Sequence, residues 1–280
     1  MTRFDANCTF LFKEFDLLER PAAAKRSGFD AIEIRWPFET ATPETSEMDA
    51  IIAAVRNSGT ELISLNLFAG DLDGPDCGIV SWPGRETEFR SAVSNAVALG
   101  EQVGTIMFNA LYGNAIPGVE PEAQAATARE NLAFASRAAE GIGATILIEP
   151  MSGPKPYPLR TASDVLSVVD DVRMAGSSNI AMLFDIFHLA NNGEDVPAAI
   201  GAAAGRIGHV QIADFPGRGE PGSGELPIAS FLTAIESTGY DGWVGLEYNP
   251  TGGDTEASLG WLPLGARSRK GGTMQESTVR

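Results

Sequence analysis

Short apolar segments alternate with longer amphipathic segments along most of the chain. Each short segment is rich in β-branched or apolar residues and is followed by turn residues, which is typical of a buried strand. The segments recur about every 25–45 residues, the length of a strand, a helix and two loops. Strands are therefore predicted at Phe4–Phe10, Ala31–Arg35, Leu62–Asn66, Thr105–Asn109, Thr145–Glu149, Ile180–Asp185, Ile207–Ala213 and Trp243–Tyr248.

The amphipathic segments between these strands are rich in Ala, Glu and Arg and are predicted to be helices. Several are followed by a glycine, which is common after the last turn of a helix, and Pro121 stands where a first turn tolerates proline. The predicted helices are Glu14–Ser27, Pro43–Asn57, Arg85–Leu99, Pro121–Glu140, Thr161–Val172, Val196–Ala204 and Ile228–Thr238. An eighth helix is poorly marked, with Ala257–Leu262 as a short candidate.

Strict alternation of strands and helices predicts a parallel sheet covered by helices. Eight repeats in about 250 residues favour a closed (β/α)8 TIM barrel over an open, doubly wound sheet. A dinucleotide-binding open sheet would carry a glycine fingerprint after its first strand, where Leu11–Glu14 stands instead. Gly217–Gly222 matches that fingerprint by letter, but no helix follows it directly, and we interpret it as a loop. We expect one barrel domain over residues 1–270 and a loose tail over 271–280.

Composition and charge narrow the classes of function. Of the 280 residues, 44% are hydrophobic and 20% charged, which is ordinary for a globular protein with a sizeable core. A net charge of −17 argues against nucleic acids and anionic lipid surfaces as partners, because those contacts need clustered Lys and Arg. No apolar run approaches the roughly 20 residues of a membrane span. The two cysteines, Cys8 and Cys77, are too few for a disulfide framework and favour a cytoplasmic location.

Polar residues stand at the ends of four consecutive predicted strands. They are Glu149, Asp185, Gln211 and Glu247. Active groups of a TIM barrel project from the C-terminal ends of its strands, so these side chains should meet at one rim. Three carboxylates buried together repel one another, and a divalent cation removes that repulsion. Four oxygen donors favour Mg²⁺ or Mn²⁺. The alternative is that each acid caps a helix or pairs with an arginine.

The chain has two histidines, which excludes a site that relies on a histidine cluster. His209 lies two residues before Gln211 and therefore points to the same side of the strand. Either residue can be the ligand from the seventh strand, and we favour a supporting position for His209 lower in the barrel. His188 lies in the loop after the sixth strand. There it either contacts a substrate oxygen or is an ordinary loop residue.

A metal ion held by oxygens and flanked by two glutamates suits one type of reaction. Such an ion stabilises the enediolate formed when a sugar-like substrate loses the proton between its carbonyl and hydroxyl carbons. Glu149 and Glu247 come from strands three apart and can therefore flank the substrate. One would remove the proton and the other would deliver it to the neighbouring carbon or the opposite face.

A set of motifs spread over residues 4–250 is more specific than the strand-end acids alone. The motifs are Gly28–Glu33, Ile148–Met151, Phe184–Asp185 with His188, Gly208–Asp214 followed by Pro216–Arg218, and Tyr240–Tyr248. Through them the chain resembles the hydroxypyruvate isomerase family, within the xylose isomerase-like (β/α)8 barrels. That resemblance implies interconversion of hydroxypyruvate and 2-hydroxy-3-oxopropanoate (tartronate semialdehyde), while close relatives isomerise 2-oxotetronates.

The resemblance also implies roles for individual residues. Glu149 and Glu247 match the family's acid–base pair, and with Asp185 and Gln211 they match its metal ligands. His188 and Arg218 match positions that contact substrate in related ketose epimerases.

One loop, Ser152–Arg160, departs from the family, which often has a polar stretch with Asn and Arg there. The loop keeps the cations Lys155 and Arg160, and a 2-oxo acid substrate needs a cation for its carboxylate. We expect Arg218 or Lys155 to bind that group. Asn66, and more weakly Asn109, are further candidates for contacts near the substrate.

The leading interpretation is a metal-dependent isomerase of a small sugar acid, acting in carbohydrate metabolism. Same-fold alternatives are a 2-oxotetronate isomerase and a 3-epimerase of free ketoses. A phosphate-cutting endonuclease is disfavoured, because it would need more histidines and a basic face. A different class is a non-catalytic barrel that binds a sugar acid. A homo-oligomer is compatible with the sequence.

Overall fold

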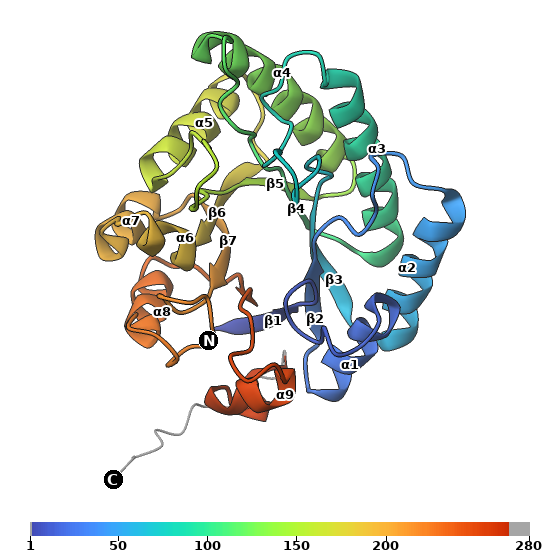
Figure 1. Cartoon of the computed structure of the whole chain (residues 1–280), viewed down its shortest axis with the longest axis vertical. Helices are drawn as coiled ribbons and strands as arrows, with labels where there is room; N and C mark the ends of the chain where they lie inside the picture. The colour runs from blue at the N-terminus through green and yellow to red at the C-terminus, as the bar shows by residue number, and fades with distance from the viewer. Residues whose placement is uncertain (1, 269–280) are drawn as a thin grey trace.

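Eight parallel strands close into a barrel in sequence order, with β8 pairing back onto β1 (Figure 1). The computed structural model describes residues 2–268, and the predicted tail over 271–280 lies outside them. The strands are β1 (Arg3–Asn7), β2 (Ala31–Ile34), β3 (Glu61–Asn66), β4 (Met107–Asn109), β5 (Thr145–Ile148), β6 (Ile180–Asp185), β7 (Ile207–Ile212) and β8 (Trp243–Leu246). The predicted TIM barrel is therefore confirmed.

The helices form a ring outside the barrel (Figure 1). They are α1 (Arg20–Arg26), α2 (Thr45–Ser58), α3 (Glu86–Val103), α4 (Pro121–Glu140), α5 (Ala162–Met174), α6 (Ile186–Asn191), α7 (Val196–Ala203), α8 (Ile228–Ser237) and α9 (Thr255–Ser258). Short 3-10 turns lie at Leu17–Glu19, Leu259–Trp261 and Leu264–Ala266.

Two helix predictions were wrong in detail. The helix predicted over Glu14–Ser27 begins only at Arg20, because Pro21 lacks the N–H that a longer helix would need there and fits only its first turn. The segment after β6, predicted to be a loop, forms helix α6. The carboxylate of Asp185 accepts the backbone N–H of His188 and so caps the start of this helix.

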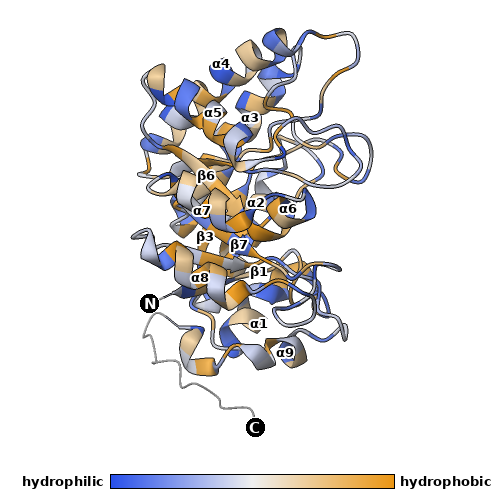
Figure 2. Cartoon of the chain, turned by 90° about the vertical axis from the view of Figure 1, so that its left-hand side faces the viewer, coloured by the Kyte–Doolittle hydropathy of each residue, from blue (hydrophilic) through white to orange (hydrophobic). Residues whose placement is uncertain are grey.

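Apolar side chains fill both faces of the barrel wall. Seven buried residues form a small cluster separate from the larger core: Ala31, Ile63, Met107, Leu147, Ala181, Leu183 and Trp243. Leu147 and Leu183 each stand two residues before a strand-end acid, so they share its inward face. The larger core packs the outer face of the sheet against the helices. Figure 2 shows mostly apolar strands inside, surrounded by helices in which apolar and polar residues alternate.

Strand register aligns polar residues at the C-terminal end of the barrel. Asn7 is level with Glu33 across β1 and β2. Asp185 is level with Gln211 across β6 and β7. Asn66 and Asn109 are paired across β3 and β4. The closed sheet therefore carries a ring of polar side chains at one end.

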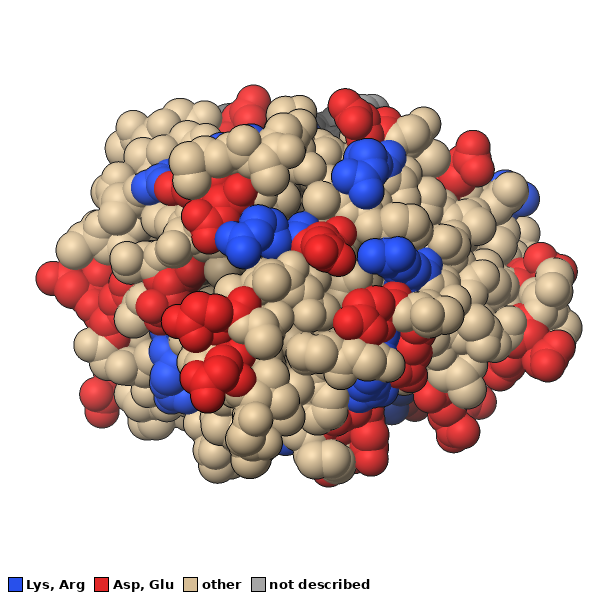
Figure 3. Space-filling model, turned by 90° about the horizontal axis from the view of Figure 1, so that it is seen from above, with Lys and Arg blue, Asp and Glu red and all other residues tan. Residues whose placement is uncertain are grey.

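The surface matches the acidic composition. On the face seen in Figure 3, acidic residues are spread among neutral ones, and basic residues stand beside them rather than forming a continuous patch. Among residues 2–268, no helix combines the length and apolar character that crossing a membrane requires.

Candidate active site

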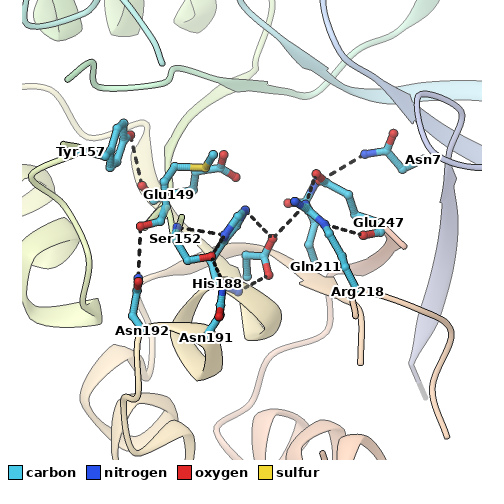
Figure 4. Close-up of polar contacts among 12 residues, drawn as sticks. Asn7, Glu149, Ser152, Tyr157, His188, Asn191, Asn192, Gln211, Arg218 and Glu247 are labelled. Atoms are coloured by element: carbon cyan, nitrogen blue, oxygen red, sulfur yellow. Dashed lines mark hydrogen bonds and ion pairs between the residues drawn. The ribbon is translucent and has the colours of Figure 1, made fainter. Parts of the chain in front are cut away.

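The four predicted strand-end residues converge at the C-terminal end of the barrel. Glu149 directly follows β5, Asp185 ends β6, Gln211 lies in β7 and Glu247 directly follows β8. All four side chains are buried. In Figure 4, Glu149, Gln211 and Glu247 surround the same space together with His188 and Arg218.

Of the three acids, Glu149 has the fewest direct contacts to its carboxylate. Within residues 2–268, no hydrogen bond or ion pair reaches its carboxylate. Burial raises the pKa of Glu149 well above its usual value, and repulsion from Glu247 and Asp185 raises it further. Both effects disfavour the ionised form, so this carboxyl group takes up a proton more readily than an exposed glutamate does.

Glu247 is surrounded by donors. Arg35 and Arg218 both donate from Nη2 to its Oε1 atom, at 2.8 Å and 2.6 Å. Asn7 donates from Nδ2 to Oε2 at 3.2 Å. Burial nevertheless raises the pKa of Glu247, with the two arginines opposing that effect. The alternative in which a strand-end acid pairs with an arginine therefore describes Glu247 in this structure.

Asp185 has a structural role as well as a place at the rim. Its Oδ1 atom accepts the backbone N–H of His188 at 3.0 Å. Its Oδ2 atom lies 3.9 Å from Nη2 of Arg218. Burial raises the pKa of Asp185, while Arg218 lowers it. The helix-cap alternative therefore holds at this position.

Gln211 is held with its oxygen free. The amide nitrogen donates to Oε1 of Glu33 at 2.9 Å. The Oε1 atom of Gln211 is buried and has no hydrogen-bond partner among the described residues. His209 points to the same side of β7, as predicted, and its Nε2 lies 3.0 Å from Oε2 of Glu33. Because that ring is engaged by Glu33 and fully buried, Gln211 is the better placed donor from β7.

A second acidic group lies next to the rim. Donor atoms of Asp5, Glu33 and His209 all lie within 4.8 Å of one another, close enough to share a metal ion. Within residues 2–268 no other group of three His, Cys, Asp or Glu side chains does so, and Glu149, Asp185 and Glu247 are spread more widely. Both oxygens of Asp5 are buried without a hydrogen-bond partner in the described chain.

The four predicted ligands fit a hard divalent cation in donor type and charge. All donors are oxygens, which Mg²⁺ and Mn²⁺ prefer. Gln211 offers an oxygen without a partner among the described residues, and no ion pair reaches the carboxylate of Glu149 there. Burial, and then repulsion from Glu247 and Asp185, raise the pKa of Glu149, and a cation would oppose both effects.

His188 is buried in helix α6 rather than exposed in a loop. Its Nδ1 atom accepts the backbone N–H of Ser152 at 3.0 Å and contacts the Ser152 hydroxyl at 2.7 Å. Burial, and then Arg218, lower the pKa of His188 to about 3. The imidazole is therefore neutral at pH 7, and its proton lies on Nε2, 3.7 Å from Oδ2 of Asp185.

The remaining predicted residues occupy different positions. Arg218 reaches the rim from the loop after β7, with a left-handed backbone φ of 58° that is unfavourable for arginine. Lys155 donates from Nζ to the backbone oxygens of Leu72 and Asp76, at 2.8 Å and 2.5 Å, and so ties two loops together. Asn66 ends β3 beside Asn109.

Sequence reasoning missed Asn7, Glu33 and Arg35. Asn7 ends β1 and donates to both Glu33 and Glu247. Arg35 directly follows β2 and reaches Glu247. The rule that polar residues at strand ends build the site, applied to the second strand, would have found Arg35. Asn7 was hidden because the first strand was predicted to run on to Phe10, whereas β1 ends at Asn7.

Comparisons with known proteins agree with the fold. A family model described as xylose isomerase-like TIM barrel matches residues 21–264. A Streptomyces coelicolor protein named "Putative hydroxypyruvate isomerase" is 48% identical, over 96% of this chain and 98% of that protein. Hydroxypyruvate isomerase of Escherichia coli and 2-oxo-tetronate isomerase of Cupriavidus necator are each 35% identical, over 94% of this chain and 98% of each protein.

Among solved structures, one named AP endonuclease, family 2, from Brucella melitensis superposes with a TM-score of 0.84. It is 31% identical in sequence, and the match covers 93% of this chain and 98% of that one. The barrel and its proportions are therefore shared with these proteins along nearly their whole length.

Proposed function

Since this chain belongs to the xylose isomerase-like TIM barrel family and its full-length relatives are isomerases, we propose that it isomerises hydroxypyruvate to 2-hydroxy-3-oxopropanoate in a metal-dependent reaction. One observation carries the proposal: Glu149 and Glu247 are brought to the same rim from β5 and β8, with their carboxyl groups close enough to influence each other's ionisation.

Glu149 suits the step that removes a proton. Its carboxylate has no ion-pair partner within 4 Å among residues 2–268, and burial raises its pKa, which makes it a stronger base than an exposed glutamate. It takes the proton from C3 of hydroxypyruvate, and the electron pair left behind forms the enediolate across C2 and C3. A proton delivered to C2, and transfer of the C3 hydroxyl proton to the C2 oxygen, then give the aldehyde product. Glu247 is the donor to C2 in this scheme.

The metal belongs to the same proposal. Glu149, Asp185, Gln211 and Glu247 would hold a divalent cation, Mg²⁺ or Mn²⁺, whose charge stabilises the enediolate oxygens. Arg218 supplies fixed positive charge at the same rim. His188 is neutral and carries its proton on Nε2, so it can donate a hydrogen bond to a substrate oxygen.

Arg218 is the better of the two predicted partners for the substrate carboxylate. It lies at the rim, and its guanidinium already binds the carboxylate of Glu247. The ammonium of Lys155 is engaged by two backbone carbonyls. Asn66 completes the predicted substrate contacts from the end of β3.

The alternative substrate with specific support is a 2-oxotetronate, because one relative named 2-oxo-tetronate isomerase is 35% identical to this chain, the same identity as the Escherichia coli hydroxypyruvate isomerase. The two acids share the 2-oxo carboxylate and differ in the length of the remaining chain. A nucleic-acid substrate is not supported, since the chain carries a net charge of −17.

Metal analysis of the purified protein, followed by an isomerisation assay, tests the proposal. We expect turnover of hydroxypyruvate that a chelator abolishes and that Mn²⁺ or Mg²⁺ restores. A 2-oxotetronate assayed in parallel ranks the two substrates by kcat/KM. Absence of turnover of either acid with either ion would overturn the proposed activity.

A further inference from the structure

Arg35 and Arg218 approach one carboxylate oxygen from two separate parts of the barrel. Arg35 follows β2, and Arg218 comes from the loop after β7. Both place Nη2 within hydrogen-bond distance of Oε1 of Glu247. Two guanidinium groups that converge on a single oxygen provide more hydrogen-bond donors than one carboxylate can use.

One of these donors is left over inside the protein. The Nε atom of Arg35 is buried and has no hydrogen-bond partner in the described chain. Nε and Nη2 form one edge of the guanidinium, the edge that a carboxylate engages with two parallel hydrogen bonds. Only Nη2 is engaged, by Glu247. A buried cationic donor without a partner is unfavourable, and it indicates a group that binds there.

Aromatic rings fix the orientation of both guanidinium groups. The Arg35 and Arg218 guanidiniums lie over the ring of Phe10, at 4.6 Å and 4.7 Å from its centre. Arg218 also lies 5.0 Å from the centre of the Phe187 ring. These cation–π contacts hold the donors in place before any ligand arrives. The Arg35 side chain is still 29% exposed, so an entering molecule can reach it.

We propose that Arg35 and Arg218 together form a binding site for the carboxylate of a 2-oxo acid, and that Arg35 gives the enzyme its preference for acids over neutral ketoses. This inference rests on the proposed function, and it adds a residue and a selection rule to it. A neutral ketose has no group that uses the paired donors, so it gains little from Arg35.

The test compares a carboxylate with its neutral counterpart. The probes are pyruvate, which has the 2-oxo carboxylate but no C3 hydroxyl to isomerise, and hydroxyacetone, which lacks the carboxylate. The variants are Arg35→Gln and Arg35→Lys, with Arg137→Gln on the exposed face of α4 as the matched control. Dissociation constants are measured by calorimetry on the full chain with Mn²⁺, alongside KM for hydroxypyruvate.

We expect Arg35→Gln to weaken pyruvate binding and to raise KM for hydroxypyruvate by about ten- to a hundredfold, the size of a lost charge-assisted pair. Hydroxyacetone binding should change by no more than about twofold. Arg35→Lys keeps the charge without the paired geometry and should give an intermediate loss. It also serves as the second variant if Arg35→Gln fails to fold by circular dichroism.

The outcomes separate the two proposals. Pyruvate binding that depends on Arg35, without turnover of hydroxypyruvate by the unmodified protein, supports the carboxylate site and overturns the isomerase assignment. Turnover that is unaffected by Arg35→Gln overturns the carboxylate site and leaves the isomerase assignment intact. Equal losses for pyruvate and hydroxyacetone also overturn it, because they would show that Arg35 acts only by supporting Glu247.

Discussion

The carboxylate of Glu33 accepts the side-chain amide N–H of Gln211 at 2.9 Å, and this contact leaves the Gln211 oxygen free at the rim. Glu33 also contacts Asn7 and His209. Three donors therefore share one carboxylate, which fixes both the position of Glu33 and the orientation of the Gln211 amide. Glu33 is a positioning residue in this arrangement.

Replacement of Glu33 by glutamine should lower the affinity for Mn²⁺ by about 10- to 100-fold, the usual effect of losing a group that orients a metal ligand. A glutamine presents one oxygen and an NH2 group, so at least one of the three donors loses its acceptor. Titration calorimetry with Mn²⁺ measures this effect independently of turnover. Glu101→Gln, an exposed acid in α3, is the control. Equal affinities in both variants would show that Glu33 does not orient Gln211.

Replacement of Glu149 by glutamine should reduce kcat by about two to four orders of magnitude, as loss of a general base does. The amide keeps the size of the side chain and an oxygen donor. Mn²⁺ binding and circular dichroism should be measured on the same preparation, so that loss of chemistry is distinguished from loss of the site. A variant that folds, binds Mn²⁺ and keeps full turnover would contradict the catalytic role of Glu149.

The stability of the metal-free protein should fall as the pH rises above the usual carboxyl range. The folded-state pKa of Glu149 is raised above its unfolded value, so the folded protein binds this proton more tightly. Its contribution to stability is complete below the unfolded pKa and is lost as the pH rises through the folded pKa. Thermal melts from about pH 5 to 8 should show this decline in the unmodified protein and a flatter profile in Glu149→Gln. Parallel profiles would contradict it.

A divalent cation should reverse that loss. Binding to the folded chain alone raises stability in proportion to the logarithm of the free ion concentration, about 2.7 kcal/mol at a hundredfold excess over Kd. Melting temperature at pH 8 should therefore rise with added Mn²⁺ in the unmodified protein. The rise should be much smaller in a variant with Asp185→Asn, Gln211→Ala and Glu247→Gln combined. A similar rise in both would place the ion elsewhere, and the group of Asp5, Glu33 and His209 is then the next candidate.

Replacement of Arg218 should mainly change KM, whereas replacement of Lys155 should mainly change the melting temperature. Arg218→Ala removes a guanidinium at the rim and should raise KM for hydroxypyruvate more than KM for a neutral ketose. Lys155→Met removes the bonds to the Leu72 and Asp76 carbonyls and should lower the melting temperature, with KM changed less. The reverse pattern would identify Lys155 as the carboxylate partner.

Much of the site follows from a local rule. Strand ends can be located from apolar runs, and a TIM barrel brings all C-terminal strand ends to one edge. Glu149, Asp185, Gln211 and Glu247 were found in this way, and the structure places them together. Arg35 obeys the same rule at the end of the second strand, but Asn7 does not follow from it, because the apolar pattern extends the predicted first strand to Phe10 and β1 ends at Asn7. The predicted start of α1 is too early because the amphipathic spacing continues on both sides of Pro21. A proline fits only the first turn of a helix, so α1 begins at Arg20.

The sequence by itself determined the alternation of strands and helices, the closed barrel and the residues at the strand ends, because these depend on spacing along a short stretch of chain. Only the tertiary structure decided which side chains contact each of these strand-end residues. Arg35 reaches Glu247 across 212 positions of sequence, and Asn7 reaches the same residue across 240, because β8 closes the barrel against β1. Closure of the sheet therefore decides that both arginines pair with Glu247 and that Glu149 has no direct ion-pair partner among the described residues, and no local sequence pattern records that.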